Sequence, residues 1–325
     1  MISVVIPLYN KAHTIVNTLN TVINQTYKDF EVVIVNDGST DNGVEVIKQN
    51  FHDDRIRIVN QTNAGVSVAR NTGIQTAKGE WIAFLDADDE WLSNYLQTVM
   101  DIQNTYTNVE LLLSGRYEQN VITRVRRSVV PTKYSDRVME INFFYNPHVF
   151  AHISATVIRT KLLQDNLDTF GLFIEGQKSN EDFTFLYRVA LHSRCLYIGM
   201  PLTVYNGGVA GQVTSVLKEQ KKLADNILMR NMVIAEWNVT KRKNKVCGIF
   251  MKYETRHTFL SKLKTYDYTG LQMLIDGMSE ECKEFYLNCI EKILLTKPIL
   301  NRMAIIYMYI TKILWRLHGY PVIGK

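Results

Sequence analysis

Cysteine is scarce in this sequence, and its spacing gives no sign of a cysteine-based site. The 325 residues contain four cysteines, and no two of them form a CxxC pair. Structural zinc sites and disulfide frameworks need closely spaced or paired cysteines, so neither is expected. We predict buried free thiols in a reducing cytosol. The four residues are Cys195, Cys247, Cys282 and Cys289.

Two other signatures of function are missing as well. The seven histidines show neither HExxH nor HxH spacing, so no histidine metal site is expected. No GxGxxG or GxxxxGK(S/T) pattern is present, so the glycines are interpreted as turn or packing residues rather than as a phosphate-binding loop. A bound phosphate would therefore need another source of positive charge, such as a metal ion.

Long apolar runs are also absent. No stretch of about 18 uncharged apolar residues occurs, which argues against a membrane-spanning helix. The N-terminal residues MISVVIPLYN enter a strand pattern at once, without a basic leader or a cleavage site of small residues. We therefore expect a cytoplasmic protein whose contact with a membrane would be peripheral.

Acidic residues are missing from the last part of the chain. After Glu291 there are six basic residues and no acidic one, and removing these six charges from the net +5 leaves −1 for residues 1–291. An apolar set near helical spacing lies in the same segment: Ile305, Ile306, Tyr309, Ile313 and Leu317. Such a helix could lie on an anionic membrane surface, or it could dock on the rest of the protein. No nucleic-acid partner is expected.

The chain has a globular composition, with 46% hydrophobic and 21% charged residues, and its first 90 residues alternate in pattern. Short apolar runs typical of buried strands alternate there with segments of helical spacing. The predicted strands are 3–7, 30–35, 55–59 and 81–85, and the predicted helices are 12–25, 44–49 and 66–76. The expected fold class is α/β, with a Rossmann-like, mostly parallel central sheet flanked by helices.

Beyond residue 90 the pattern is less regular. The expected elements are a helix at 92–106, strands at 109–113 and 150–160, and a helix at 180–193. Asn180 is predicted to be the N-cap of the last of these. Residues 116–137 are basic and irregular, and residues 241–245 (KRKNK) are predicted to form an exposed turn. After a boundary near Thr214 the pattern is mainly helical.

Polar clusters follow three of the predicted strands. PLYN (7–10) follows the first strand, NDGSTD (36–41) the second and DADDE (86–90) the fourth. In parallel sheets ligands bind beyond the carboxyl ends of the strands. The three loops are therefore predicted to converge on one crevice.

The DADDE segment concentrates negative charge at the end of a strand. Clustered carboxylates repel one another unless a cation or several hydrogen-bond donors meet them. In an extended backbone Asp86 and Asp88 would face the same way, with the small Ala87 out of the path. We therefore predict an Mg²⁺ or Mn²⁺ site for a diphosphate, with Asp88 and Asp86 as ligands. The alternative is that the cluster caps the following helix, a role open to Asp89 and Glu90.

Four segments in this order resemble the family 2 glycosyltransferases, which have the GT-A fold and transfer sugars with inversion. They are SVVIPLYN, VIVNDGSTD, NAGVSVARNTGIQTAKGEWIAFLDADDEW and NEDFTFLYRV. The resemblance implies a GT-A catalytic domain at 1–215, with nucleotide-sugar binding in 1–90 and the acceptor side in 91–215. A mainly helical C-terminal region at 216–325 would follow.

The resemblance assigns the first two loops to the nucleotide. It implies that Pro7, Leu8 and Tyr9 form a platform for the base. Asn10 would face the base or the ribose. Asp37 would accept a hydrogen bond from uracil N3–H, although turn chemistry is an alternative role for it.

The resemblance also assigns residues around the acidic segment. Arg70 would lie near the nucleotide, and its alternative role is an ion pair with a strand-end carboxylate. Asp86 and Ala87 would lie near the ribose or the metal, and Asp88 would be the direct metal ligand.

On the acceptor side the resemblance points to Glu181 and Asp182. Transfer with inversion needs a base on the face opposite the departing nucleotide diphosphate. The resemblance implies that Asp182 is this base and that Glu181 binds the acceptor or orients Asp182. In the first turn of a helix, the dipole should hold the pKa of Asp182 low. Without the resemblance, both residues could be ordinary N-terminal helix charges.

The wider implications concern the substrates. The resemblance implies a UDP-linked donor, transfer of a hexosyl or N-acetylhexosaminyl group, and a glycan or lipid-linked glycan acceptor. The setting would be bacterial surface-polysaccharide synthesis at the inner face of the cell membrane. The segment 205–215 receives no role, since the expected histidine or arginine is missing.

Two other functions were compared with this interpretation. A sugar nucleotidyltransferase would be expected to show a Gly-rich basic loop where this chain has PLYN. A non-catalytic nucleotide-sugar-binding protein would not need both a metal candidate and a base candidate.

Overall fold

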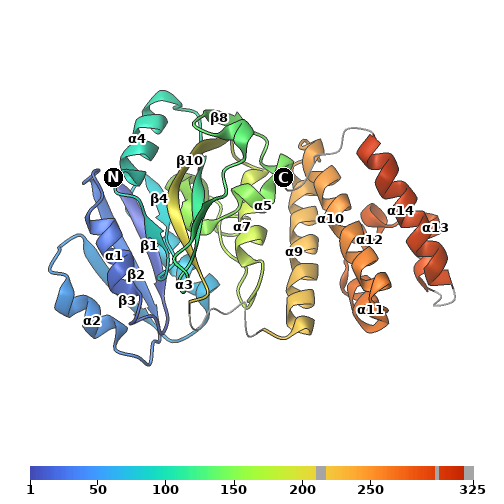
Figure 1. The fold of residues 1–325 in the computed structure, drawn as a ribbon, viewed down its shortest axis with the longest axis horizontal. Coiled ribbons are helices and arrows are strands. Elements are labelled where there is room, and N and C mark those ends of the chain that lie inside the picture. The colour runs from blue at the N-terminus through green and yellow to red at the C-terminus, as the bar shows by residue number, and fades with distance from the viewer. Residues whose placement is uncertain (210–216, 297–299, 318–325) are drawn as a thin grey trace. The chain divides into compact units, whose positions relative to one another are not determined.

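The computed structural model describes residues 1–209, 217–296 and 300–317 (Figure 1). Contacts divide the chain into two compact units. The sheet unit comprises Met1–Phe143 and Pro147–Val216, and the helical unit comprises Phe144–Asn146 and Leu217–Lys325. The finer division of the first unit into a donor part and an acceptor part stays a prediction.

One mixed sheet of ten strands runs through the described part of the sheet unit. The strand order is β3-β2-β1-β4-β9-β6-β10-β5, with β7 paired to β6 and β8 paired to β10. The strands are β1 (Ile2–Leu8), β2 (Phe30–Asp37), β3 (Ile56–Gln61), β4 (Trp81–Phe84), β5 (Glu90–Trp91), β6 (Leu111–Asn120), β7 (Arg126–Ser128), β8 (Val138–Ile141), β9 (Thr156–Arg159) and β10 (Cys195–Gly207). The first four strands in this order are parallel, β9 is antiparallel to β4 and β6, and β10 is parallel to β6. The predicted α/β class with a mostly parallel central sheet is confirmed.

The central strands are buried on both faces, which explains their continuous apolar runs. Val4 and Val5 of β1 point to opposite faces, and both are fully buried. Apolar side chains of α1 (Ile15–Ile23), α2 (Gly43–Asn50) and α4 (Tyr95–Thr105) share one core with Val4. On the other face α3 (Val66–Thr76) packs so closely that a Cβ at Gly73 would lie 2.2 Å from Val5 Cγ1. This close approach fixes the helix that follows the NDGSTD loop.

Two regions differ from the sequence prediction. Residues 150–160 are not one strand, because α5 (Pro147–Phe150) and a 3₁₀ turn at Ile153–Ala155 precede β9. Residues 116–137 are not irregular, because β6 extends to Asn120 and forms a hairpin with β7. Both differences arise from pairing with strands that are distant in sequence, which a local apolar pattern does not reveal.

The described part of the helical unit contains six helices. They are α9 (Glu219–Val239), α10 (Lys245–Lys264), α11 (Tyr268–Gly277), α12 (Glu280–Tyr286), α13 (Cys289–Thr296) and α14 (Asn301–Leu317). The predicted exposed turn at KRKNK is confirmed between α9 and α10, where Lys241 and Arg242 have positive φ angles of 53° and 54°. Among the described residues, no helix has both the length and the apolar character that crossing a bilayer requires.

All four cysteines are free thiols. Cys195, Cys247 and Cys282 are buried as predicted, whereas Cys289 is exposed at the start of α13. The prediction of buried thiols is therefore wrong for Cys289.

Candidate active site

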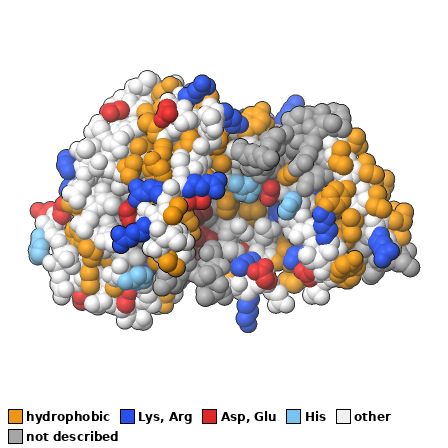
Figure 2. Space-filling model, viewed as in Figure 1, with side chains coloured by type: hydrophobic (Ala, Val, Ile, Leu, Met, Phe, Trp, Pro, Cys, Tyr) orange, Lys and Arg blue, Asp and Glu red, His pale blue; other side chains and the backbone are white. Residues whose placement is uncertain are grey.

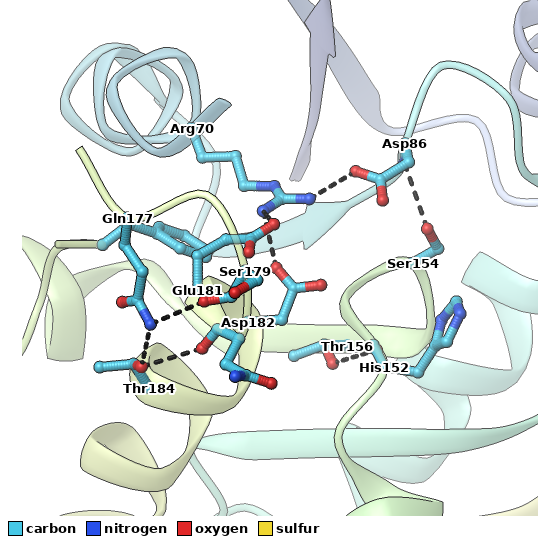
Figure 3. Close-up of polar contacts among 12 residues, drawn as sticks. Arg70, Asp86, His152, Ser154, Thr156, Gln177, Ser179, Glu181, Asp182 and Thr184 are labelled. Atoms are coloured by element: carbon cyan, nitrogen blue, oxygen red, sulfur yellow. Dashed lines mark hydrogen bonds and ion pairs between the residues drawn. The ribbon is translucent and has the colours of Figure 1, made fainter. Parts of the chain in front are cut away.

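A single arginine joins two acidic segments that are far apart in sequence. Arg70, on α3, places Nη2 2.7 Å from Asp86 Oδ1 and Nη1 2.6 Å from Asp182 Oδ1 (Figure 3). Its Nη1 also lies 3.7 Å from Glu181 Oε1. Asp86 follows β4, and Glu181 and Asp182 are the first two residues of α7 (Glu181–Ala190). The structure therefore brings four of the predicted site residues together.

An aromatic cluster fixes the elements that carry these residues. Arg70 is 2% exposed, and its guanidinium carbon lies 5.2 Å from the ring centroid of Phe173. The Phe173 ring stacks on Phe185 of α7 at 3.9 Å, and both rings meet Phe84 of β4 edge-on. Asn71 exchanges two hydrogen bonds, of 3.0 and 2.8 Å, with the backbone of Phe173. The elements α3, α7 and β4 are therefore held in a fixed relation around Arg70.

The start of α7 is held in a different way from the one predicted. Asn180 has a left-handed φ of 57°, and its side chain makes no capping hydrogen bond, so the predicted N-cap is wrong. Instead Gln177 Nε2 donates to Ser179 O and to Thr184 Oγ1, at 2.9 and 2.8 Å (Figure 3). Thr184 Oγ1 in turn donates to Asn180 O at 2.9 Å. These buried contacts aim the first turn of α7 at Arg70.

The charges around Arg70 do not balance. Burial alone would lower the pKa of Arg70, but attraction to Asp182, Asp86 and Glu181 raises it above its ordinary value, so the guanidinium stays charged. Burial raises the pKa of Asp182 to about 8; Arg70 opposes this rise, and Glu181 and Asp86 add to it. The prediction of a low pKa for Asp182 is wrong, because burial and two neighbouring carboxylates outweigh the helix dipole and the arginine.

The acidic loop after β4 turns instead of continuing as an extended strand. The N–H of Asp89 donates to the carbonyl of Asp86 at 3.0 Å and closes a turn. Asp86 pairs with Arg70, whereas Asp88 Oδ2 accepts from Lys11 Nζ at 2.7 Å. The expectation that an extended backbone presents both carboxylates to one partner is therefore wrong. The sequence analysis missed Lys11, whose only signal was its place directly after PLYN.

Asp89 holds the acidic loop from inside the protein. It is 1% exposed, and its carboxylate accepts from Ser154 Oγ at 2.6 Å and from the N–H of Asn206 at 3.1 Å. Ser154 Oγ also accepts from the N–H of Asp86 at 3.2 Å (Figure 3). Burial and two neighbouring carboxylates raise the pKa of Asp89 well above its ordinary value. Capping of the next helix is excluded for Asp89, since α4 begins only at Tyr95.

The acidic loop suits a hard divalent cation that is completed by a substrate. Among the described residues, no group of three or more His, Cys, Asp or Glu side chains is placed to hold a metal ion. Mg²⁺ and Mn²⁺ commonly use one or two carboxylates together with waters and substrate phosphates. Asp88 fits this role, because it is 13% exposed and Lys11 occupies its Oδ2. A cation at Asp88 requires Lys11 to move aside or to share the carboxylate.

Asp37 uses most of its hydrogen-bonding capacity inside the protein. It is 2% exposed, and Oδ1 accepts from Gln61 Nε2 at 2.7 Å and from the N–H of Ala64 at 2.9 Å. Oδ2 accepts from the N–H of Gly65 at 2.8 Å, at the start of α3. Asp37 therefore fixes the origin of the helix that carries Arg70. Its contact with a nucleotide base stays a prediction.

The PLYN loop offers a ligand one large side chain. Tyr9 is 47% exposed, whereas Pro7 is half-buried and Leu8 is fully buried. Asn10 has a φ of 50°, and its Oδ1 accepts hydrogen bonds from the backbone of the loop after β2. Ala87 of the acidic loop is 3% exposed. A base could stack on Tyr9, but Leu8 and Ala87 could contact a ligand only through their backbones.

A polar pocket of about 380 Å³ lies beside Asp88. Its lining includes Asn17, Asp88, Glu90, Gln119, Arg124 and Asn206. Glu90 does not cap a helix either, since it lies in β5 and accepts from Asn206 Nδ2 at 3.2 Å. Asn206 belongs to the segment 205–215, of which residues 210–215 lie outside the described residues. Amides and carboxylates of this kind can bind sugar hydroxyls, and the arginine can bind phosphate.

Comparison with known proteins identifies the family. The profile described as Glycosyl transferase family 2 matches residues 3–166. An uncharacterized glycosyltransferase of Rickettsia bellii is 33% identical over 221 residues, which cover 66% of this chain and 28% of the relative. One from Rickettsia prowazekii is 27% identical over 271 residues, which cover 82% of this chain and 79% of the relative. The chain spans less than a third of the length of several other curated relatives that it matches.

The solved structures agree on the fold. The crystal structure of S. aureus TarS 1-349 in complex with UDP-GlcNAc is 21% identical, with a TM-score of 0.71 and coverage of 98% of this chain and 92% of that one. A mannosyltransferase from Pyrobaculum calidifontis, in complex with GDP-Man and Mn²⁺, is 17% identical with a TM-score of 0.55, over 97% of this chain and 86% of that one. The resemblance drawn from the sequence is confirmed: the chain belongs to glycosyl transferase family 2 and has the GT-A fold.

Proposed function

We propose that the protein is a glycosyltransferase that moves a sugar from a nucleotide-sugar donor to an acceptor hydroxyl with inversion. One observation carries the proposal: Arg70 binds Asp86 of the acidic loop and Asp182 of α7 at 2.7 and 2.6 Å. The candidate base therefore lies beside the loop that would hold the donor diphosphate. This is the arrangement that a displacement at the anomeric carbon between diphosphate and base requires.

The donor is proposed to be UDP-linked, with a hexosyl or N-acetylhexosaminyl group. The exposed Tyr9 supports a stacking site for the base, and Asp37 lies at the end of the neighbouring strand β2. TarS, which shares the fold, was crystallised with UDP-GlcNAc, and this motivates the choice of base and sugar to be tested first. Pro7 and Asn10 would shape the same site, the first from β1 and the second by ordering the loop after β2.

A divalent cation, Mn²⁺ or Mg²⁺, is proposed to bind at Asp88, with Asp86 nearby. When bound, such an ion neutralises the charge that develops on a departing diphosphate. The chain contributes the Asp88 carboxylate, and Asp89 and Ser154 hold the loop that presents it. Lys11 would add a second positive charge at the same place.

Asp182 is proposed to accept the proton of the acceptor hydroxyl. The acceptor oxygen forms a bond to the anomeric carbon as the bond from that carbon to the diphosphate oxygen breaks, and the proton passes to Asp182. Arg70 pairs with Oδ1 of Asp182, so Oδ2 is the oxygen that would receive it. Glu181, at 3.7 Å from the same guanidinium nitrogen, would bind the acceptor or orient Asp182.

The acceptor is proposed to be a glycan or a lipid-linked glycan of bacterial surface-polysaccharide synthesis, reached from the cytoplasmic face of the membrane. The polar pocket beside Asp88 supports a carbohydrate ligand, because amide and carboxylate groups from four elements line it.

A donor screen tests the proposal. Purified protein is incubated with UDP-, GDP- and dTDP-linked sugars in the presence of Mn²⁺, and nucleotide release and sugar transfer are measured. Turnover of at least one UDP-sugar is expected, with a strong reduction in the presence of EDTA. A clear preference for a guanine nucleotide would overturn the role of Asp37, and absence of turnover with every donor would overturn the enzymatic assignment.

A further inference from the structure

Seven large apolar side chains lie exposed on the last two described helices. They are Ile290 and Ile293 of α13 and Met303, Ile306, Ile310, Ile313 and Leu314 of α14. Each of them is between 48% and 61% exposed. We call these seven residues the apolar surface. Contiguous exposed apolar residues of this kind mark a site of interaction with another molecule or a membrane.

The five residues of α14 lie on one stripe of the helix. At 100° per residue, positions 303, 306, 310, 313 and 314 fall within an arc of about 100°. Ala304 and Met308 lie on a different side of α14 and are buried, at 1% and 0% exposed. The helix therefore docks with one side and leaves an apolar stripe uncovered among the described residues. Docking and an apolar exposed face, which the sequence offered as alternatives, occur together.

The stripe also differs from the one predicted from helical spacing. Ile306 and Ile313 are exposed as a surface stripe requires, but Ile305 and Tyr309 are half-buried. The exposed face is therefore rotated relative to the predicted one.

The charge around the apolar surface has one sign. No acidic residue follows Glu291 in the sequence, and Glu291 itself is 1% exposed and paired with an arginine of α10. Lys292 of α13 and Arg302 of α14 are exposed, and Lys264 Nζ lies 4.6 Å from the ring centroid of Tyr309. Figure 2 shows hydrophobic side chains gathered over α13 and α14, with basic side chains among them. The surface therefore combines an apolar face with positive charge.

We propose that the apolar surface docks α13 and α14 on an anionic lipid bilayer. Apolar side chains of such helices enter the boundary between headgroups and acyl chains, and lysine and arginine bind the anionic headgroups. A second copy of the chain fits less well. A twofold interface would set Lys292 and Arg302 against a surface with the same basic residues, and α13 and α14 expose no carboxylate among their described side chains that would neutralise them. The docking does not depend on the proposed glycosyl transfer.

Vesicle flotation with the full chain tests the proposal. Vesicles of phosphatidylcholine with about 30 mol% phosphatidylglycerol are compared with vesicles of phosphatidylcholine alone. We expect partitioning onto the anionic vesicles to exceed that onto the neutral ones by about tenfold, and to fall as salt screens the headgroup charge. Equal partitioning onto both kinds, or none onto either, would overturn the proposal.

Two matched double variants locate the contact. Ile306→Glu with Ile310→Glu changes two residues of the stripe that are 61% and 52% exposed. The control is Ile122→Glu with Val239→Glu, which are 83% and 70% exposed, lie elsewhere and change the net charge equally. We expect the first variant to lose partitioning by about tenfold or more, and the control to change by about twofold or less.

The result also separates the other candidates for the surface. Equal losses in the two variants would show that net charge alone matters, and this would overturn the role of the stripe. A wild-type dimer by light scattering that the first variant abolishes would assign the surface to a second copy and overturn lipid docking. Donor turnover is measured in parallel, so failure of vesicle binding with normal turnover affects only this proposal.

Discussion

The loops after β2 and β4 both carry buried aspartates, yet their charges are met in opposite ways. Asp37, after β2, accepts three hydrogen bonds from uncharged donors, two of them backbone N–H groups at the start of α3. The region around the loop after β4 gathers five carboxyl groups near two cationic side chains among the described residues. The five are Asp86, Asp88, Asp89, Glu181 and Asp182, and the cations are Lys11 and Arg70.

This difference separates structural carboxylates from functional ones. A carboxylate whose oxygens are satisfied by internal donors stabilises the fold and gains little from a ligand. A group of carboxyls with too few cations has raised pKa values and lies ready to bind a cation or a proton. We therefore expect substitution at Asp37 to reduce stability first, and substitution in the acidic loop or at Asp182 to reduce activity first.

The largest effect is expected at the candidate base. Asp182→Asn should lower donor turnover by about 10²–10⁴-fold, because the acceptor loses its proton acceptor. UDP affinity by calorimetry should stay unchanged, since Asp182 would act on the acceptor. The matched control is Glu181→Gln, for which a smaller loss is expected. Turnover of Asp182→Asn equal to that of the wild type would refute the assignment of the base.

The next effect concerns the cation at the acidic loop. Asp88→Asn should abolish the stimulation of turnover by Mn²⁺ and reduce the rate by about 10²-fold, because the ion loses its carboxylate ligand. UDP binding with and without Mn²⁺ gives a readout that does not depend on turnover. Lys11→Met is the comparison, because it keeps the carboxylate and removes its partner. If EDTA leaves the rate unchanged while Lys11→Met lowers it, Lys11 supplies the charge and the metal proposal fails.

The pH dependence gives a third and smaller effect. The pKa of Asp182 is raised to about 8, so the fraction of deprotonated base rises with pH up to that value. Below pH 8, kcat/KM should therefore increase by about tenfold per pH unit, and above it the profile should level off. The residual activity of Asp182→Asn should lack this slope. A flat wild-type profile between about pH 6 and 9 would contradict a neutral Asp182 in the free enzyme.

The smallest change in turnover, with a change in stability instead, is expected at Asp37. Asp37→Asn replaces one accepting oxygen by an NH₂ group that faces internal donors, and it should reduce the free energy of unfolding by about 1–3 kcal/mol. Chemical denaturation measures this loss. Asp101→Asn, at an exposed position on α4, should change the free energy of unfolding by less than about 0.5 kcal/mol. A normal stability for Asp37→Asn together with lost UDP binding would move Asp37 to the functional group.

Several features of the fold were predictable because their causes are local. The helix over residues 66–76 and the strands that precede the three polar loops follow from apolar spacing and turn residues, and the structure has them within a few positions. The strand at 150–160 was overpredicted, since apolar residues in a 3₁₀ turn resemble those of a strand. The length of β6 was underpredicted, since its second half is ordered by pairing with β7 and β10 rather than by apolar side chains.

The amino-acid sequence by itself determined the alternation of strands and helices, the family, and the gathering of PLYN, NDGSTD and DADDE at one edge of the sheet. Periodicity and turn chemistry depend on neighbouring residues, so they are readable along the chain. Only the tertiary structure decided that Arg70 joins Asp86 to Asp182, that Lys11 meets Asp88, and that one side of α14 remains uncovered. Charge pairing, burial and the resulting pKa values depend on distances between segments that are remote in sequence, and these distances are set by packing.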